Sequence, residues 1–296
     1  MNGFFKDENG KEMLVLGMQA HNSSTGTFMM ERTIRAARLF NANTLEVPIY
    51  WYKVEPQKDT FDMTQVKHLI DQIRETDKKL IILWFATSKN GHPTYAPEYI
   101  KTNPETYKVA VGSNGAWVAS LSPHCMETLE RDKKAFCKLV EFIKEYDKNQ
   151  KTVIALQIEN EMGLANTDRD YSALAQADYA KPVPEELRNS RLTDDGLEYI
   201  SQEEKDNHSW KGHFGRHAAE VFCAWYHGKY IGTITEGDLL WYLKEQGFPA
   251  VEELEDVSIT VVHRHRDNKA VNVHEKMEGL IEKVTNQNFV PVVDDD

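Results

Sequence analysis

The stretch Leu80-Ile81-Ile82-Leu83-Trp84-Phe85 is apolar at every position. A strand with one solvent-exposed face alternates apolar and polar residues, so an unbroken apolar run predicts a strand buried on both faces. Apolar residues at helical spacing precede this run at residues 63–73 and, after a long loop, follow it at residues 129–143. A buried strand between two such helices is typical of a parallel sheet that helices cover.

Working outward, the same alternation of strand and helix recurs along the chain. Apolar runs at residues 13–18, 44–51 and 153–161 predict three more strands. We expect the four strands to be adjacent and parallel in sequence order. An open doubly wound sheet and a barrel both fit this pattern. The long loops after the third and fourth strands favour the barrel, because barrel enzymes build their sites there. The expected fold class is therefore α/β, of the (β/α)8 TIM-barrel type.

The barrel is expected to be incomplete. One strand-plus-helix unit takes roughly 30 residues, and after Ile231 the chain has only 65 residues, from 232 to 296. That length provides about two units where a full barrel would need four. We expect residues 1–231 to form the N-terminal part of a barrel. Residues 232–296 are expected to form a diverged α/β tail, with a strand at 257–262 and a helix at 277–284.

Composition excludes several classes of partner. The chain has 35 Lys and Arg against 47 Asp and Glu, a net charge of −12, which disfavours a nucleic-acid partner. No run of 18 apolar residues predicts a membrane span. The first residues lack a signal-peptide pattern, and the three cysteines lie far apart, so we expect a cytoplasmic protein. No phosphate-loop, nucleotide or zinc motif is present, so no cofactor and no metal are expected.

The residues with the clearest chemistry are Gln157-Ile158-Glu159-Asn160-Glu161, at the end of the fourth strand. Strand alternation puts Gln157, Glu159 and Glu161 on one side, which is the interior of a barrel. Inward carboxylates are costly unless they are hydrogen-bonded or used. Glu161, the last of them, opens onto the loop face, where a partly desolvated carboxylic acid can protonate a glycosidic oxygen. The alternative is an acidic cluster at a strand end.

This motif resembles the Gln-x-Glu-Asn-Glu signature of glycoside hydrolase family 35, and its Asn-Glu pair resembles the acid/base signature of the wider clan A. Trp51, Glu55-Pro56 and Phe61-Asp62 resemble a stretch of β-galactosidases from families 35 and 42. The resemblance covers roughly residues 10–231. The chain departs from family 35 at Met162, where an aromatic residue is usual, and at Lys151-Thr152, where a Gly-Gly-Pro is usual.

The resemblance implies a retaining glycosidase of carbohydrate metabolism that hydrolyses O-glycosidic bonds of β-galactosides. It assigns Glu161 as general acid/base and Asn160 as the ligand of the sugar 2-hydroxyl. Sugar rings stack on aromatic side chains, and sugar hydroxyls form hydrogen bonds with polar side chains. The remaining candidate substrate-binding residues are therefore Glu159, Trp84, Lys89, Asn90 and Trp51. Glu55 is expected to anchor loops, and Trp51 and Trp84 have a competing role in the core.

The second carboxylate of a retaining site is not identifiable. Such a nucleophile lies about 5 Å from the acid, and in clan A it ends the seventh strand. Glu236 follows a helix, so we do not assign it. We expect turnover by this chain alone to be low. Two alternatives stay open: a catalytically inactive carbohydrate-binding relative, and a truncated barrel fragment that associates, for example into a homo-oligomer, to cover its sheet edge.

Overall fold

The structure is a computed structural model that describes residues 5–6, 12–21, 26–89, 91–148, 151–164, 166–188 and 200–235. The strand and helix predicted at 257–262 and 277–284 lie outside the described residues. So does nearly all of the predicted tail domain. Within the described residues, no helix is long and apolar enough to cross a membrane.

The central sheet has the predicted strand order. Its strands are β3 (Gly17–Gln19), β4 (Thr44–Tyr50), β5 (Lys79–Lys89) and β8 (Val153–Asn160), arranged as β3-β4-β5-β8. All three pairings are parallel. The prediction of four adjacent parallel strands in sequence order is confirmed. Within the described residues β8 lies at one end of the sheet, so it is not a central strand.

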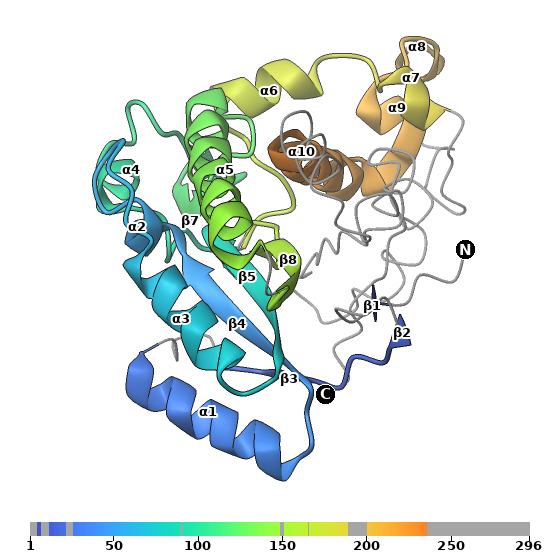
Figure 1. The fold of residues 1–296 in the computed structure, drawn as a ribbon. Coiled ribbons are helices and arrows are strands. Elements are labelled where there is room, and N and C mark those ends of the chain that lie inside the picture. The colour runs from blue at the N-terminus through green and yellow to red at the C-terminus, as the bar shows by residue number, and fades with distance from the viewer. Residues whose placement is uncertain are drawn as a thin grey trace.

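Each of the four strands is followed by a long helix. The first three of these helices lie before the next strand, and the fourth lies before residue 236. These helices are α1 (Thr27–Leu39), α3 (Thr64–Arg74), α5 (Met126–Asp147) and α10 (Ala218–Thr235). Figure 1 shows α1, α3 and α5 one after another along the same side of the sheet. The fold class is therefore α/β of the TIM-barrel type. The described residues form four strand-helix units and no closed barrel.

The two faces of the sheet differ in their covering. Every second residue of β5, from Leu80 through Ile82 and Trp84, joins the main core against the helices. The residues between them point to the opposite face, which is the interior side of a barrel. There Leu83 and Phe85 form a small separate cluster with Tyr50 at the end of β4. Alternation along β5 thus separates a helix-packed face from an aromatic inner face.

The first strand differs from its prediction. Residues 13–18 were expected to form one strand, but Met13 lies in β2 (Glu12–Met13), which pairs antiparallel with β1 (Phe5–Lys6). The Asn43 side chain accepts from the Leu16 amide at 2.8 Å and donates to the Leu14 carbonyl at 2.7 Å. Because Asn43 satisfies these backbone groups, the parallel ladder begins only at Gly17.

The remaining elements lie mostly in the two long loops. The loop after β4 holds α2 (Trp51–Val54), and the loop after β5 holds α4 (Glu98–Lys101) and the hairpin of β6 (Val109–Val111) and β7 (Trp117–Leu121). Between β8 and α10 lie α6 (Ala173–Tyr179), α7 (Glu185–Arg188), α8 (Gln202–Asp206), α9 (Trp210–Phe214) and a 3-10 turn (Gly215–His217).

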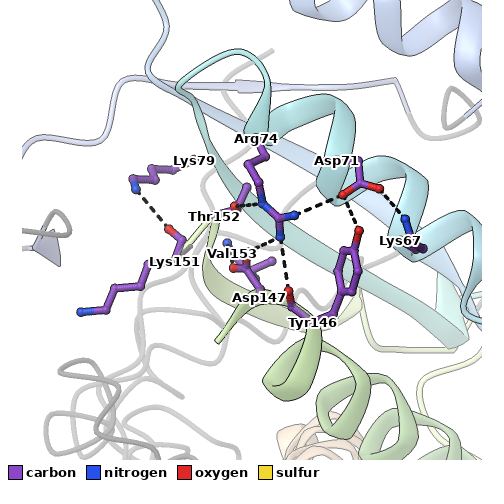
Figure 2. A network of polar contacts seen from close by, with 9 residues as sticks. All are labelled: Lys67, Asp71, Arg74, Lys79, Tyr146, Asp147, Lys151, Thr152 and Val153. Carbon is purple, nitrogen blue, oxygen red and sulfur yellow. Dashed lines mark hydrogen bonds and ion pairs between the residues drawn. The ribbon is translucent and has the colours of Figure 1, made fainter. Parts of the chain in front are cut away.

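A polar network fixes the beginning of β8. Figure 2 shows Arg74 from α3 reaching Asp147 at the end of α5, with a nitrogen–oxygen distance of 3.0 Å. The other oxygen of Asp147 accepts from the Val153 amide at 2.8 Å, and the Arg74 Nε donates to the Thr152 hydroxyl at 3.3 Å. Two helices therefore hold the start of the strand whose far end leads to Glu161.

Candidate active site

The end of β8 is shaped by a bulge in β5. Trp84 pairs with Ile158, but the next pair is Lys89 with Asn160, so five residue steps on β5 match two on β8. The extra residues turn backbone amides toward Glu159. Its carboxylate accepts from the amides of Ala86 (3.2 Å), Thr87 (2.9 Å) and Ser88 (2.9 Å), and from the Thr87 hydroxyl (2.7 Å).

Glu159 therefore joins the ends of two strands. Its side chain is buried, with 1% exposure, and its carboxylate accepts four hydrogen bonds from β5. Glu159 and Glu161 both have left-handed backbone, with φ of 61° and 49°. The prediction that Gln157, Glu159 and Glu161 share one face is wrong. Gln157 pairs with Leu83, which is on the inner face, whereas the Glu159 carboxylate accepts from Thr87 beside Asp132, which comes from the covering helix α5. The bulge and the positive φ angles interrupt the alternation.

Glu161 lies directly after β8, at the carboxyl end of the sheet. Its side chain is 19% exposed, and the Lys89 ammonium lies 3.9 Å from its Oε2. The Ser88 hydroxyl donates to the Glu161 carbonyl at 3.4 Å. A nearby cavity of about 10 Å³, lined by Thr87, Ser88 and Tyr230 among others, has room for about one water. Glu161 is not among the residues that line it.

Asn160 and Lys89 complete this group. With its oxygen toward Lys89, the Asn160 amide accepts from the Lys89 ammonium at 2.9 Å and from the Glu161 amide at 3.3 Å. The two residues also pair across the sheet. The structure thus brings together Glu161, Asn160 and Lys89, with Glu159 beneath them. Asn90, another predicted site residue, lies outside the described residues.

The two predicted tryptophans occupy supporting positions. Trp84 and Trp51 are fully buried, so neither presents a ring face to a sugar in this structure. The Trp84 indole N–H donates to Asp132 at 2.9 Å, and the Trp51 indole N–H donates to Glu55 at 2.9 Å. Both rings pack on the helix side of the sheet, which is the side opposite to the inner aromatic face.

The inner face carries aromatic rings of its own. Tyr50 stacks on Tyr95 with ring centroids 4.4 Å apart, and Tyr95 lies 5.5 Å from Phe85. Lys89 lies 5.4 Å from the Phe85 centroid. A wider hollow of about 550 Å³ opens beside Tyr50 and Tyr52. Aromatic rings in contact therefore lie between this hollow and Lys89, which is itself beside Glu161.

Sequence reasoning missed Asp132. It is fully buried on α5 and is contacted from two other elements, by Trp84 and by Tyr230. Leu129 and Phe136 flank it on the apolar stripe of this helix at positions i−3 and i+4. A carboxylate on such a stripe is unusual, because Asp is almost never fully buried without a partner. That position was the signal that could have identified it.

Four parallel strands covered by helices, with Asn160 and Glu161 at the carboxyl end of the fourth, are arranged as in part of a TIM barrel. The chain belongs to the glycoside hydrolase family 42, described as beta-galactosidase, whose family model matches residues 24–231. Of the two families that its motifs resemble, family 42 is the one that this match shows. No curated protein matches the chain significantly.

Two solved structures match part of this chain, and the first of them has a similar fold. The crystal structure of a beta-galactosidase from the psychrophilic Marinomonas ef1 has 12% identity and a TM-score of 0.53, and the match covers 84% of this chain and 37% of that one. The exo-beta-1,4-mannosidase Op5Man5 from Opitutaceae bacterium strain TAV5 has 15% identity and a TM-score of 0.40, over 59% and 28% of the two chains. This chain thus spans little more than a third of the length of the beta-galactosidase.

Proposed function

We propose that the chain supplies the acid/base half of a retaining β-galactosidase site of the clan A type. Glu161 is the general acid/base, and Asn160 is the ligand of the sugar 2-hydroxyl. The observation that carries the proposal is the position of Glu161 directly after the fourth parallel strand, beside Asn160 and Lys89, in a chain of family 42.

The chemistry follows from this position. In the first step of a retaining mechanism, one carboxyl group protonates the leaving oxygen while a second attacks the anomeric carbon. Glu161, partly exposed at the open end of the strand, takes the first role. Glu159 does not take the second, because its carboxylate is buried and bonded to the amides of β5. The nucleophile is therefore unassigned among the described residues.

The sugar is a β-galactoside in this proposal, and the half-buried rings of Tyr52 and Tyr95 offer the faces on which it stacks. They take the role that the sequence suggested for Trp51 and Trp84. We retain the division into residues 1–231, the catalytic half-barrel, and residues 232–296, a tail. The second candidate function is sugar binding without turnover. It is favoured by the bonds that hold the Glu159 carboxylate, because they leave Glu161 without an assigned nucleophile among the described residues.

Hydrolysis of nitrophenyl β-galactoside by wild type and by Glu161→Gln tests the catalytic role. Acid assistance alone supplies only about 10²–10⁴-fold, against roughly 10⁶–10¹⁷-fold for complete enzymes. We expect slow turnover that Glu161→Gln changes little. Fast hydrolysis that Glu161→Gln abolishes would instead show that this chain also supplies the nucleophile.

Calorimetric titration with a β-galactoside tests the sugar-binding role separately. We expect Asn160→Ala to weaken binding about tenfold, which corresponds to the loss of one net hydrogen bond of about 1.4 kcal/mol. Asn207→Ala, an exposed position after α8, is the matched control and should bind as wild type does. Equal binding by Asn160→Ala and wild type would contradict the proposed site.

A further inference from the structure

Two carboxyl groups are buried together below the turn that carries Glu161. Asp132 comes from α5 and Glu159 from the end of β8, and both are buried, at 0% and 1% exposure. The Thr87 hydroxyl oxygen lies between them, 2.7 Å from Glu159 Oε1 and 3.4 Å from Asp132 Oδ2. The Tyr230 hydroxyl, from α10, donates to Asp132 Oδ2 at 3.1 Å. Three elements and the bulge of β5 therefore meet at this pair.

The hydrogen-bond count favours a proton between these groups. An ionised carboxylate only accepts hydrogen bonds, and the Thr87 hydroxyl, which has a single hydrogen, lies beside both carboxyl groups. Glu159 already accepts from three backbone amides and from the single hydrogen of Thr87. Its negative charge is thus well solvated by donors. Asp132 accepts from the side chains of Trp84 and Tyr230, and its Oδ2 also faces the Thr87 oxygen, whose hydrogen is closer to Glu159. The proton therefore belongs on Asp132.

The charges around the pair agree with this assignment. The groups that face Asp132 from other elements are the acid Glu159 of β8, the phenols Tyr230 of α10 and Tyr99 of α4, and the neutral donors of β5. In the part of the chain that the structure describes, neither carboxylate forms an ion pair with Lys, Arg or His. Burial, followed by the charge of Glu159, raises the pKa of Asp132 well above its usual value.

The pair also holds strained backbone. Glu159 and Glu161 adopt left-handed φ angles, which are unfavourable for residues other than glycine. Such a turn persists only where its surroundings hold it, and the bonds between Glu159 and β5 provide that hold. Asn160 lies between the two left-handed residues. Any loss of the Glu159 contacts therefore changes where Asn160 and Glu161 point.

We propose that Asp132 is a positioning residue: it carries the proton of a carboxylic acid–carboxylate pair with Glu159, and through Glu159 it fixes the turn that presents Asn160 and Glu161. The presence of the proton stands independently of the enzyme's activity. The consequence for sugar binding rests on the proposed function. Neither role is visible from the Gln157–Glu161 motif, since Asp132 lies on a helix some 25 residues earlier in the chain.

The test exploits the likeness between a protonated Asp and Asn. Asp132→Asn supplies a permanent donor in place of the acid proton, so the variant should fold at about pH 5 with a Tm close to that of wild type. The folded-state pKa of Asp132 lies above its unfolded value, so wild type loses stability as pH rises through the interval between the two. We expect the difference in Tm, Asp132→Asn minus wild type, to increase by at least about 3 °C between pH 5 and pH 9.

Asp147→Asn is the matched control. Asp147 is buried on the same helix, but it pairs as a carboxylate with Arg74 and accepts from Val153. Its substitution should lower Tm at about pH 5 and at about pH 9 alike. The proposal is overturned if Asp132→Asn loses as much stability at pH 5 as Asp147→Asn does, or if Asp132→Asn fails to fold at pH 5. A Tm difference from wild type that does not change with pH overturns it as well.

Infrared spectroscopy provides a direct readout of the proton. We expect a buried protonated-carboxyl C=O band in wild type at neutral pH that is missing in Asp132→Asn and present in Asp147→Asn. These measurements contain no sugar, so they separate the two claims. A band without β-galactoside binding refutes the proposed function and leaves the pair intact. Identical spectra for wild type and Asp132→Asn refute the pair whatever the sugar titration gives.

Discussion

Glu55 offers the sharpest test of how the loops above the sheet are held. The residue follows α2 and its side chain is fully buried. Its two oxygens accept from the Trp51 indole (2.9 Å), the Tyr99 hydroxyl (2.9 Å), the Asp59 amide (2.8 Å) and the Arg131 guanidinium. One carboxylate thus ties α2, α4 and α5 together, which agrees with the anchoring role expected from the sequence.

The substitution Glu55→Gln keeps the volume and removes the charge. Its amide group replaces an oxygen that accepts hydrogen bonds, so at least one donor loses its partner. Arg131 is 12% exposed and keeps Asp59 at 2.8 Å as a second, half-exposed partner. Removing one member of a buried ion pair costs about 3–5 kcal/mol. Because Asp59 remains, we expect the lower end, about 3 kcal/mol, or a fall in Tm of roughly 6–12 °C.

Urea unfolding followed by circular dichroism measures this loss. Lys138→Met is the control, because it breaks an ion pair with Glu141 in which both side chains are largely exposed, and it should have no measurable effect. The double variant Glu55→Gln/Arg131→Met should recover part of the loss, since it also removes the guanidinium that has lost its buried partner. A loss below about 1 kcal/mol for Glu55→Gln, or full additivity in the double variant, would refute the buried-pair account.

Two further predictions concern the helices after β8. Burial lowers the pKa of His227 to about 4 from its ordinary 6.5. The free energy of unfolding should therefore fall by up to about 3 kcal/mol as pH falls through that interval. In urea titrations, His227→Gln should reduce this loss of stability at acid pH, and His208→Gln, at an exposed position, should not. An unchanged loss of stability at acid pH in His227→Gln would contradict this. A Cβ on Gly212 would lie 2.0 Å from the Glu204 carbonyl oxygen, whereas one on Gly26 meets nothing within 4 Å. Gly212→Ala should therefore lower the free energy of unfolding by about 3 kcal/mol, and Gly26→Ala should change it little. Equal Tm values for the two variants would show that α8 and α9 can move apart without a loss of stability.

The sequence was sufficient for the strands and their order, because long apolar runs can be buried in few ways and crossovers between parallel strands are right-handed. It was insufficient where one segment depends on another. The Glu159 carboxylate is bound by amides of the bulge in β5, a different strand, and the β8 sequence does not encode that contact. The alternation of side chains along β5 could have predicted the face of Trp84, since Trp84 lies on the same, helix-covered face as Leu80 and Ile82. Residue type alone suggested a sugar contact there.

The position of Glu161 is fixed from both ends of β8, and this determines what the first half of the barrel can contribute by itself. At the start of the strand, Asp147 holds the Val153 amide and is held by Arg74. At the end, Glu159 is bonded to the amides of β5. A strand bound at both ends cannot slide along its neighbour, because a shift of one residue would move its ends by about 3.3 Å and break both sets of bonds. The turn with Asn160 and Glu161 is therefore formed by residues of the first four strand-helix units. In the proposed function this turn is the acid/base half of the site, and its shape then depends on contacts within these four units.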